Sequence, residues 1–224
     1  MKKYELTTET LQLAGLTLHR IKAVKNFGSV KAGELGGWIE SEENLSQADN
    51  AWVYNNAKVF DKARVYGDAA VSDDATVCGY AIVNDNARVY DNAEVSGYVE
   101  VFENAIVFGH AKVYGFTRIF GNAIVLGNAI LFGHAKVYGK ATINGDAKVY
   151  DAADYIVFKN FWSSERYFTW TRSNNKWSVG CFYGTGEELI KKAYADSEKS
   201  GREYERVVRY VESILADEKK EKSN

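Results

Sequence analysis

Small and hydrophobic residues recur with a period of six along the middle of the chain. Residues 51–152 can be written as seventeen consecutive hexads without an insertion. The third position of every hexad is aliphatic, from Val53 to Val149, and the first is alanine except at Val99 and Thr117. The fifth position is mostly glycine, aspartate or asparagine. This regularity is the strongest signal in the sequence.

A period of six fits neither an α-helix, whose apolar period is about 3.6, nor an amphipathic strand, whose period is about 2. It predicts a solenoid in which each hexad supplies one short strand and one corner. The aliphatic residue then points into a narrow prism, the alanine packs beside it, and glycine, aspartate or asparagine takes the corner, where an unusual φ is needed. With three hexads to a turn, the coils would stack to a height of roughly 25 to 30 Å.

This run of hexads resembles the hexapeptide-repeat family, whose members fold as left-handed parallel β-helices with a triangular cross-section. The left hand comes from the resemblance, because the general rule for parallel crossovers favours the right-handed form. The expected fold is therefore mainly β, a left-handed parallel β-helix (a hexapeptide solenoid) with a small C-terminal α+β domain. The resemblance does not fix the function, because the family includes acyltransferases, carbonic anhydrase-like proteins and purely structural members.

Residues 1–50 are expected to form an N-terminal cap, because the open end of a solenoid exposes unpaired strand edges and core side chains. Residues 16–27 have the pattern of a strand, and the segment that follows is rich in turn residues. This part resembles the leading segment of bacterial and phage hexapeptide proteins. In that arrangement Leu35, Trp38 and Ile39 would cover the end of the prism.

Residues 153–218 break the hexad register and are expected to form the α+β domain, with a charged tail at 219–224. Two helices are predicted to open at Thr185 and Ser200, each followed three residues later by glutamate in the pattern of a capping box. The domain resembles those appended to hexapeptide-repeat proteins in phage and prophage genomes. Three aromatic-rich segments read as its strands: 155–161, 166–172 and 176–184.

Charge and composition narrow the choice of partners and location. The formal net charge of -2 and the isoelectric point near 6.0 give no electrostatic argument for nucleic acid or for an anionic membrane. The N-terminus lacks an apolar signal segment and no window is long enough to span a membrane, so the expected location is the cytoplasm of a bacterial host cell. Cys78 and Cys181 are expected to be reduced thiols, without a disulfide or zinc site.

The histidines are the first candidates for chemistry, because hexapeptide acyltransferases typically use one. His19 precedes the repeat, whereas His110 and His134 take the sixth position of hexads at different corners, more than one coil apart. They cannot cluster within one chain, and no loop interrupts the coil to enclose a site. The sequence therefore predicts no catalytic residue, no metal and no cofactor, and we expect the corner histidines to be solvated.

Outward-facing apolar residues are the more informative feature. A monomer seldom exposes a large contiguous apolar patch, so these side chains are expected to be covered. Three explanations remain for what covers them. The first is the C-terminal domain or simple stacking along the ladder, the second is another copy of the chain, and the third is a foreign protein. The predicted interface consists of Phe102, Ile106, Phe108, Phe120, Ile124, Leu126, Ile130 and Phe132.

The tryptophans of the C-terminal domain are a second candidate for partner binding. They are Trp162, Trp170 and Trp177. Large aromatic side chains are common at interfaces, but burial in the domain core explains Trp170 and Trp177 equally simply.

These observations predict a non-catalytic binding or scaffolding protein that acts through protein–protein contacts and forms a homo-oligomer. The resemblance to phage and prophage proteins suggests an inhibitor of a bacterial antiviral system, of the CRISPR kind, as one specific form. Two alternatives stay open. One is a hexapeptide-type acyltransferase, and the other is a small-molecule or nucleotide sponge formed at a subunit boundary.

Overall fold

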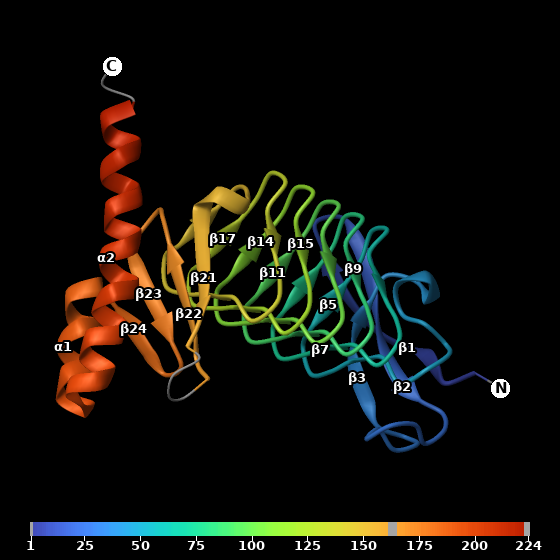
Figure 1. Ribbon diagram of the computed structural model, residues 1–224. Coiled ribbons are helices and arrows are strands. Elements are labelled where there is room, and N and C mark those ends of the chain that lie inside the picture. The colour runs from blue at the N-terminus through green and yellow to red at the C-terminus, as the bar shows by residue number, and fades with distance from the viewer. Residues whose placement is uncertain (1, 161–164, 222–224) are drawn as a thin grey trace. The chain divides into compact units, whose positions relative to one another are not determined.

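The computed structural model describes residues 2–160 and 165–221. Contacts within the chain divide it into two compact units, residues 1–154 and 155–224, which are described separately below. The first unit contains the N-terminal cap and a stack of coils, and the second contains a small sheet and two helices (Figure 1). The predicted fold class, a left-handed parallel β-helix with a C-terminal α+β part, is confirmed.

Each hexad of residues 51–152 forms one strand of two residues, and the strands line up in three parallel sheets of about six turns. The first face holds β4 (Trp52–Val53), β7 (Ala70–Val71), β10 (Arg88–Val89), β13 (Ile106–Val107), β16 (Ile124–Val125) and β19 (Thr142–Ile143). The second holds β5 (Lys58–Val59), β8 (Thr76–Val77), β11 (Glu94–Val95), β14 (Lys112–Val113), β17 (Ile130–Leu131) and β20 (Lys148–Val149). The third holds β6 (Arg64–Val65), β9 (Ile82–Val83), β12 (Glu100–Val101), β15 (Arg118–Ile119) and β18 (Lys136–Val137).

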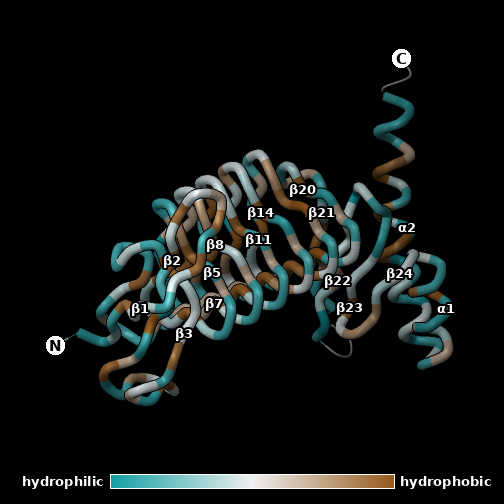
Figure 2. Tube along the Cα trace, turned by 180° about the vertical axis from the view of Figure 1, so that it is seen from behind, coloured by the Kyte–Doolittle hydropathy of each residue, from teal (hydrophilic) through white to brown (hydrophobic). Residues whose placement is uncertain are grey.

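The core of the solenoid is built from the first and third positions of the hexads. Every one of these side chains is at most 1% exposed, including Val99 and Thr117, which replace alanine. Hydrophobic positions recur from coil to coil along the trace (Figure 2). Residues eighteen apart pair in parallel, as Ile106 does with Ile124. Each outward side chain therefore has its closest neighbours one coil before and one coil after it.

The corners depend on residues that tolerate a positive φ. Every fifth-position residue from Asn55 to Gly145 has one. Aspartate at this position adds a bond along the stack, because the Asp61 carboxylate accepts the amide N–H of Gly79 at 3.0 Å. The acidic corners thus have a structural explanation in backbone hydrogen bonding.

The N-terminal cap contains more strand than the sequence pattern predicted. A hairpin of β1 (Tyr4–Leu13) and β2 (Leu16–Ala23) leads to β3 (Leu35–Ile39), which pairs in parallel with β5. Only the second hairpin strand was expected. Trp38 and Ile39 are buried as residues of β3, whereas Leu35 is 49% exposed, so its assignment to the end of the prism is wrong.

Parallel stacking also begins earlier than the hexad run. Ile39 pairs with Val59, and Leu45 forms an isolated parallel bridge with Val65. Both separations are twenty residues instead of eighteen, because two extra residues lie between Ser46 and Asp49, where the regular register begins with the Asn50 amide donating to the Gly67 carbonyl. A short 3-10 helix, η1 (Glu42–Asn44), lies at the start of the third face, and buried Asn44 donates to the carbonyls of Asp61 and Ala63.

The C-terminal unit is an antiparallel sheet with two helices. A 3-10 turn, η2 (Ala152–Asp154), ends the first unit, and the sheet has the order β21 (Tyr155–Lys159), β22 (Tyr167–Thr171), β23 (Lys176–Val179) and β24 (Phe182–Gly184). The third predicted strand is thus two strands, because Gly180 adopts a φ of 59° and reverses the chain.

The helices are α1 (Gly186–Asp196) and α2 (Glu198–Glu221). The capping box at Thr185 is confirmed, with the Glu188 amide donating to the Thr185 hydroxyl. The predicted opening at Ser200 is wrong, because α2 begins two residues earlier and the Ser200 amide donates to the hydroxyl of Ser197. Among the described helices, none is both long enough and apolar enough to cross a membrane.

Candidate functional site

The eight side chains of the predicted interface all lie outward but are half-buried. They are spread over the three faces of the prism and shield one another along the ladders. The rings of Phe102 and Phe120 stack with centroids 5.0 Å apart, and Tyr90 stacks on Phe108 at 4.8 Å. The stacking explanation for these residues therefore accounts for much of their burial.

The most exposed aromatic residues of the solenoid lie elsewhere, at the corner between the second and third faces. Tyr80, Tyr98, Phe116 and His134 occupy the sixth position of successive coils and form one continuous stack, which we call the aromatic corner. Neighbouring centroids are 4.8, 5.1 and 5.2 Å apart, and the planes are within 10° of parallel. The rings thus cover one another's faces and present their edges outward.

Exposure separates the aromatic corner from the predicted interface. Tyr80, Tyr98 and Phe116 are 54%, 53% and 55% exposed. The sequence prediction missed them because it considered only residues on either side of the inward aliphatic position. The signal was present: at eighteen-residue spacing the sixth positions read Tyr, Tyr, Phe and His.

Charged pairs lie on the two faces that meet at the aromatic corner. On the second face, Glu94 and Lys112 form an ion pair of 3.1 Å, and on the third face Glu100 accepts a 2.7 Å bond from Arg118. The Arg118 guanidinium also lies over the Phe102 ring at 5.2 Å. These pairs are exposed and contribute little to stability, but they add charged groups to both faces.

Conventional catalytic groupings are not formed by the described residues. The imidazoles of His19, His110 and His134 have no hydrogen-bond partner there, and no cluster of three or more metal-ligating side chains occurs among these residues. Burial raises the pKa of Cys78, with Asp61 and Glu94 adding to the shift, which is the opposite of an activated thiol.

The tryptophans of the C-terminal unit are differently placed. Trp170 and Trp177 are 1% and 2% exposed and belong to its hydrophobic core, with the Trp170 indole donating to Asn175 at 2.8 Å. Trp162 lies outside the described residues. The role of these side chains in partner binding stays a prediction, and packing accounts for the two that are described.

The repeat and the coil together make this chain a hexapeptide-repeat β-solenoid, as the resemblance implied. No family model matches the sequence. The chain is 36% identical over 69 residues to a protein of Escherichia coli strain K12 named the uncharacterized acetyltransferase YdcK. The match covers 27% of this chain and 21% of the relative, so the chain spans only about a fifth of the length of that protein.

This similarity corrects one expectation from the sequence. The prediction that the chain is not an enzyme is contradicted, because the matched protein is named an acetyltransferase and the solenoid is of a type common among acyltransferases. The absence of a histidine cluster within one chain was the reason for that prediction. The reasoning was incomplete, because subunits can combine to form a site that neither contains alone.

Proposed function

We propose that this solenoid binds a protein partner through its aromatic corner. The observation that carries the proposal is the continuous stack of Tyr80, Tyr98, Phe116 and His134, in which three rings are more than half exposed. Stacking alone does not require such exposure, since Phe102 and Phe120 stack while half-buried. A ridge of exposed rings is an unfavourable surface to leave in water.

The chemistry of the corner supports a protein as the partner. Protein interfaces are enriched in tyrosine, phenylalanine and arginine at their centre and carry polar groups at the rim. Here the exposed rings lie at the corner, and the Glu94–Lys112 and Glu100–Arg118 pairs lie on the two adjoining faces. A partner with a groove fits this convex edge, and that partner is either a second copy of the chain or a different protein.

The test compares the wild-type chain with Phe116→Asp. The matched control is Tyr210→Asp, because Tyr210 is 56% exposed and belongs to the C-terminal unit. Light-scattering mass and capture from a lysate of the source organism are measured for all three proteins, after circular dichroism confirms the fold. We expect self-association, or a stoichiometric captured protein, with wild type and the control but not with Phe116→Asp. Equal behaviour of the three would contradict the proposal.

Acyl transfer is a second candidate function, favoured by the similarity to a protein named an acetyltransferase. It is compatible with protein binding and would use a histidine such as His134, which is exposed at the end of the stack. The test follows release of the free thiol from acetyl-CoA with a panel of amine and hydroxyl acceptors. Turnover lost in His134→Ala or His110→Ala would support transfer, and no turnover above the uncatalysed rate would contradict it.

A phage or prophage origin and inhibition of an antiviral system depend on resemblance alone. The location in the cell and the number of copies in an oligomer also stay predictions.

A further inference from the structure

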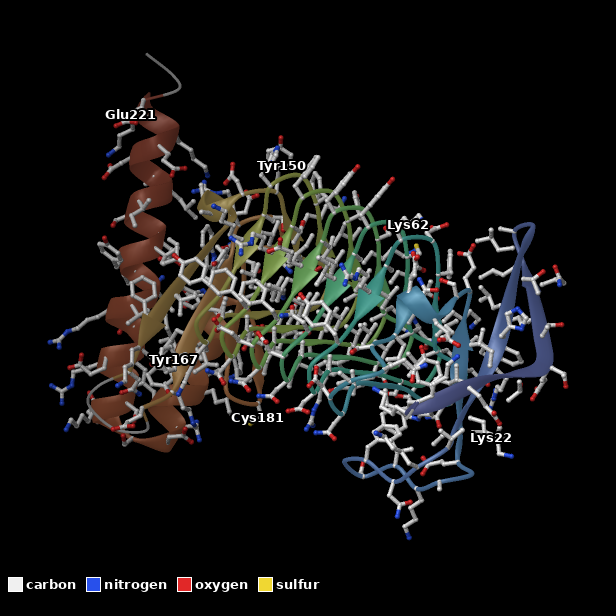
Figure 3. The ribbon with its side chains drawn as sticks, turned by 90° about the vertical axis from the view of Figure 1, so that its right-hand side faces the viewer. Lys22, Lys62, Tyr150, Tyr167, Cys181 and Glu221 are labelled. Carbon is white, nitrogen blue, oxygen red and sulfur yellow. The ribbon has the colours of Figure 1, made fainter. Side chains whose placement is uncertain are left out.

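An open hollow of about 570 Å³ lies where the third face of the solenoid begins. Its lining consists of Glu43, Lys62, Ala63, Arg64 and Tyr80. Figure 3 labels Lys62 toward the N-terminal end of the coils. The volume is in the range of small-molecule sites, which run from roughly 300 to 1,000 Å³.

The hollow arises from the way the third face starts. This sheet begins at β6, and the segment before it forms the 3-10 helix η1 and one isolated bridge from Leu45 instead of a full strand. At the level of the missing strand, the outward side of the face has no regular ladder of side chains. Space is therefore left beside Arg64, the first outward residue of the face.

One face of the Tyr80 ring borders this space. Tyr98 stacks on the other face, with the two planes 3° from parallel. The hollow is lined by Tyr80 but not by Tyr98, and its remaining lining residues precede Tyr80 by about one coil or more. Tyr80 is thus the first ring of the aromatic corner. The same corner position one coil earlier is Lys62, whose side chain is 67% exposed, so a flat ring that enters the hollow would lie between Lys62 and Tyr80.

Two cations lie at the level where that additional ring would be. Lys62 forms a loose ion pair of 3.9 Å with Glu43, and the two side chains are 67% and 79% exposed. Such an exposed pair is weak, so Lys62 can leave Glu43 and bind another anion. Arg64 has no carboxylate of a described residue within ion-pair distance, and its guanidinium is 6.0 Å from the Tyr66 ring. An anionic group on the ring would find both cations next to it.

We propose that this hollow binds a nucleotide, with its base stacked on the free face of Tyr80 and its phosphate held by Arg64 and Lys62. Arginine matches the geometry of phosphate, and its charge-assisted hydrogen bonds are stronger than neutral ones. The ligand is a free mononucleotide and not a nucleic-acid strand, because Tyr98 and Phe116 are covered on both faces and the other open face of the stack, on His134, lies three coils away. The site goes beyond the proposed protein-binding function and does not depend on it.

The probes are AMP, adenosine, inorganic phosphate and a single-stranded oligoadenylate, and binding is measured by calorimetry with the full chain. Aromatic stacking and a charge-assisted hydrogen bond each strengthen nucleotide binding, and adenosine and phosphate each lack one of the two. We therefore expect AMP to bind at least about ten-fold more tightly than adenosine or phosphate alone. Binding of the oligonucleotide more tightly than AMP would overturn the assignment to a mononucleotide.

Matched variants locate the site. Tyr80→Ala and Arg64→Gln should each weaken AMP binding by about five-fold or more. Tyr138→Ala removes an equally exposed ring that neither lines the hollow nor stacks on Tyr80, and Arg88→Gln removes an arginine of the same hexad position on another face. Both controls should leave the affinity unchanged. Failure of AMP to bind, or equal losses in the test and control variants, would overturn the proposal, whereas protein binding by Phe116 would be unaffected by that result.

Discussion

Tyr80 and Tyr98 are eighteen residues apart in the sequence, and their rings stack with centroids 4.8 Å apart and planes 3° from parallel. The same one-coil separation pairs the strands and stacks the remaining rings of the aromatic corner. A residue on this solenoid therefore acts as part of a ladder. The effect of a substitution depends on the residues eighteen positions before and after it.

Two glycines at one corner test how closely the coils approach. Gly121 and Gly139 have φ values of 74° and 68°, so alanine is strained at both. A Cβ at Gly121 would lie 2.8 Å from the amide nitrogen of Gly139, whereas nothing lies within 4 Å of a Cβ at Gly139. We expect Gly139→Ala to lower the free energy of unfolding by about 1 kcal/mol, and Gly121→Ala by about 1 to 3 kcal/mol more. Denaturant titration measures both, and equal losses would show that the coils adjust freely.

Lys3 gives the cap a pH-dependent stability. Its side chain is 1% exposed and donates to the carbonyls of Ala48 and Ala51, and burial lowers its pKa from 10.5 to about 8, with Asp49 opposing the shift. Between these pH values the unfolded chain binds more protons than the folded one, so this residue's contribution to stability rises with pH.

The measurement compares wild type with Lys3→Met at pH 7.5 and 9.5. Burial raises the pKa values of Tyr4 and Cys78, which lowers stability as the pH rises toward and above their ordinary values, but both effects cancel in the comparison. Between pH 7.5 and 9.5, the free energy of unfolding of wild type should rise by on the order of 1 to 2 kcal/mol relative to that of Lys3→Met. A constant difference between the two proteins would show that Lys3 keeps an ordinary pKa.

Arg118 combines a charge pair with two aromatic neighbours. It donates to Glu100 and lies 5.2 Å and 5.8 Å from the ring centroids of Phe102 and Phe120. Lys112 makes a comparable exposed pair with Glu94 and has no ring contact of this kind among the described residues. Arg118→Ala should therefore lower the free energy of unfolding by about 0.5 to 1 kcal/mol more than Lys112→Ala does. Thermal denaturation of the two variants measures the difference. Equal effects would mean that the rings do not interact with the guanidinium.

The sequence predicted the solenoid because its physical requirements are local and repeated. A prism of this width accepts only small residues at the first position and aliphatic residues at the third, so Val53 and Val149 already identify the core. Positive φ at each corner likewise restricts the fifth position. The cap was less predictable, because two extra residues between Ser46 and Asp49 shift the register and hide Ile39 and Leu45 from a strict six-residue pattern.

The candidate site was only partly predictable for a different reason. The hexad pattern shows which residues point outward, but exposure depends on the neighbours in the coils before and after. Ile106 and Ile124 are adjacent in the ladder and shield each other in part. Phe116 was overlooked at a corner, where few side chains pack beside it and more than half of its surface stays exposed.

The most direct test of the central claim is site-specific photocrosslinking from the aromatic corner. A photoreactive phenylalanine replaces Phe116 in one protein and Tyr210 in the control, and both are illuminated in cells of the source organism. If the aromatic corner binds a protein, position 116 gives a discrete crosslinked protein, either a second copy or another partner, and position 210 does not. No crosslink from position 116, or the same products from both positions, would contradict protein binding by this surface.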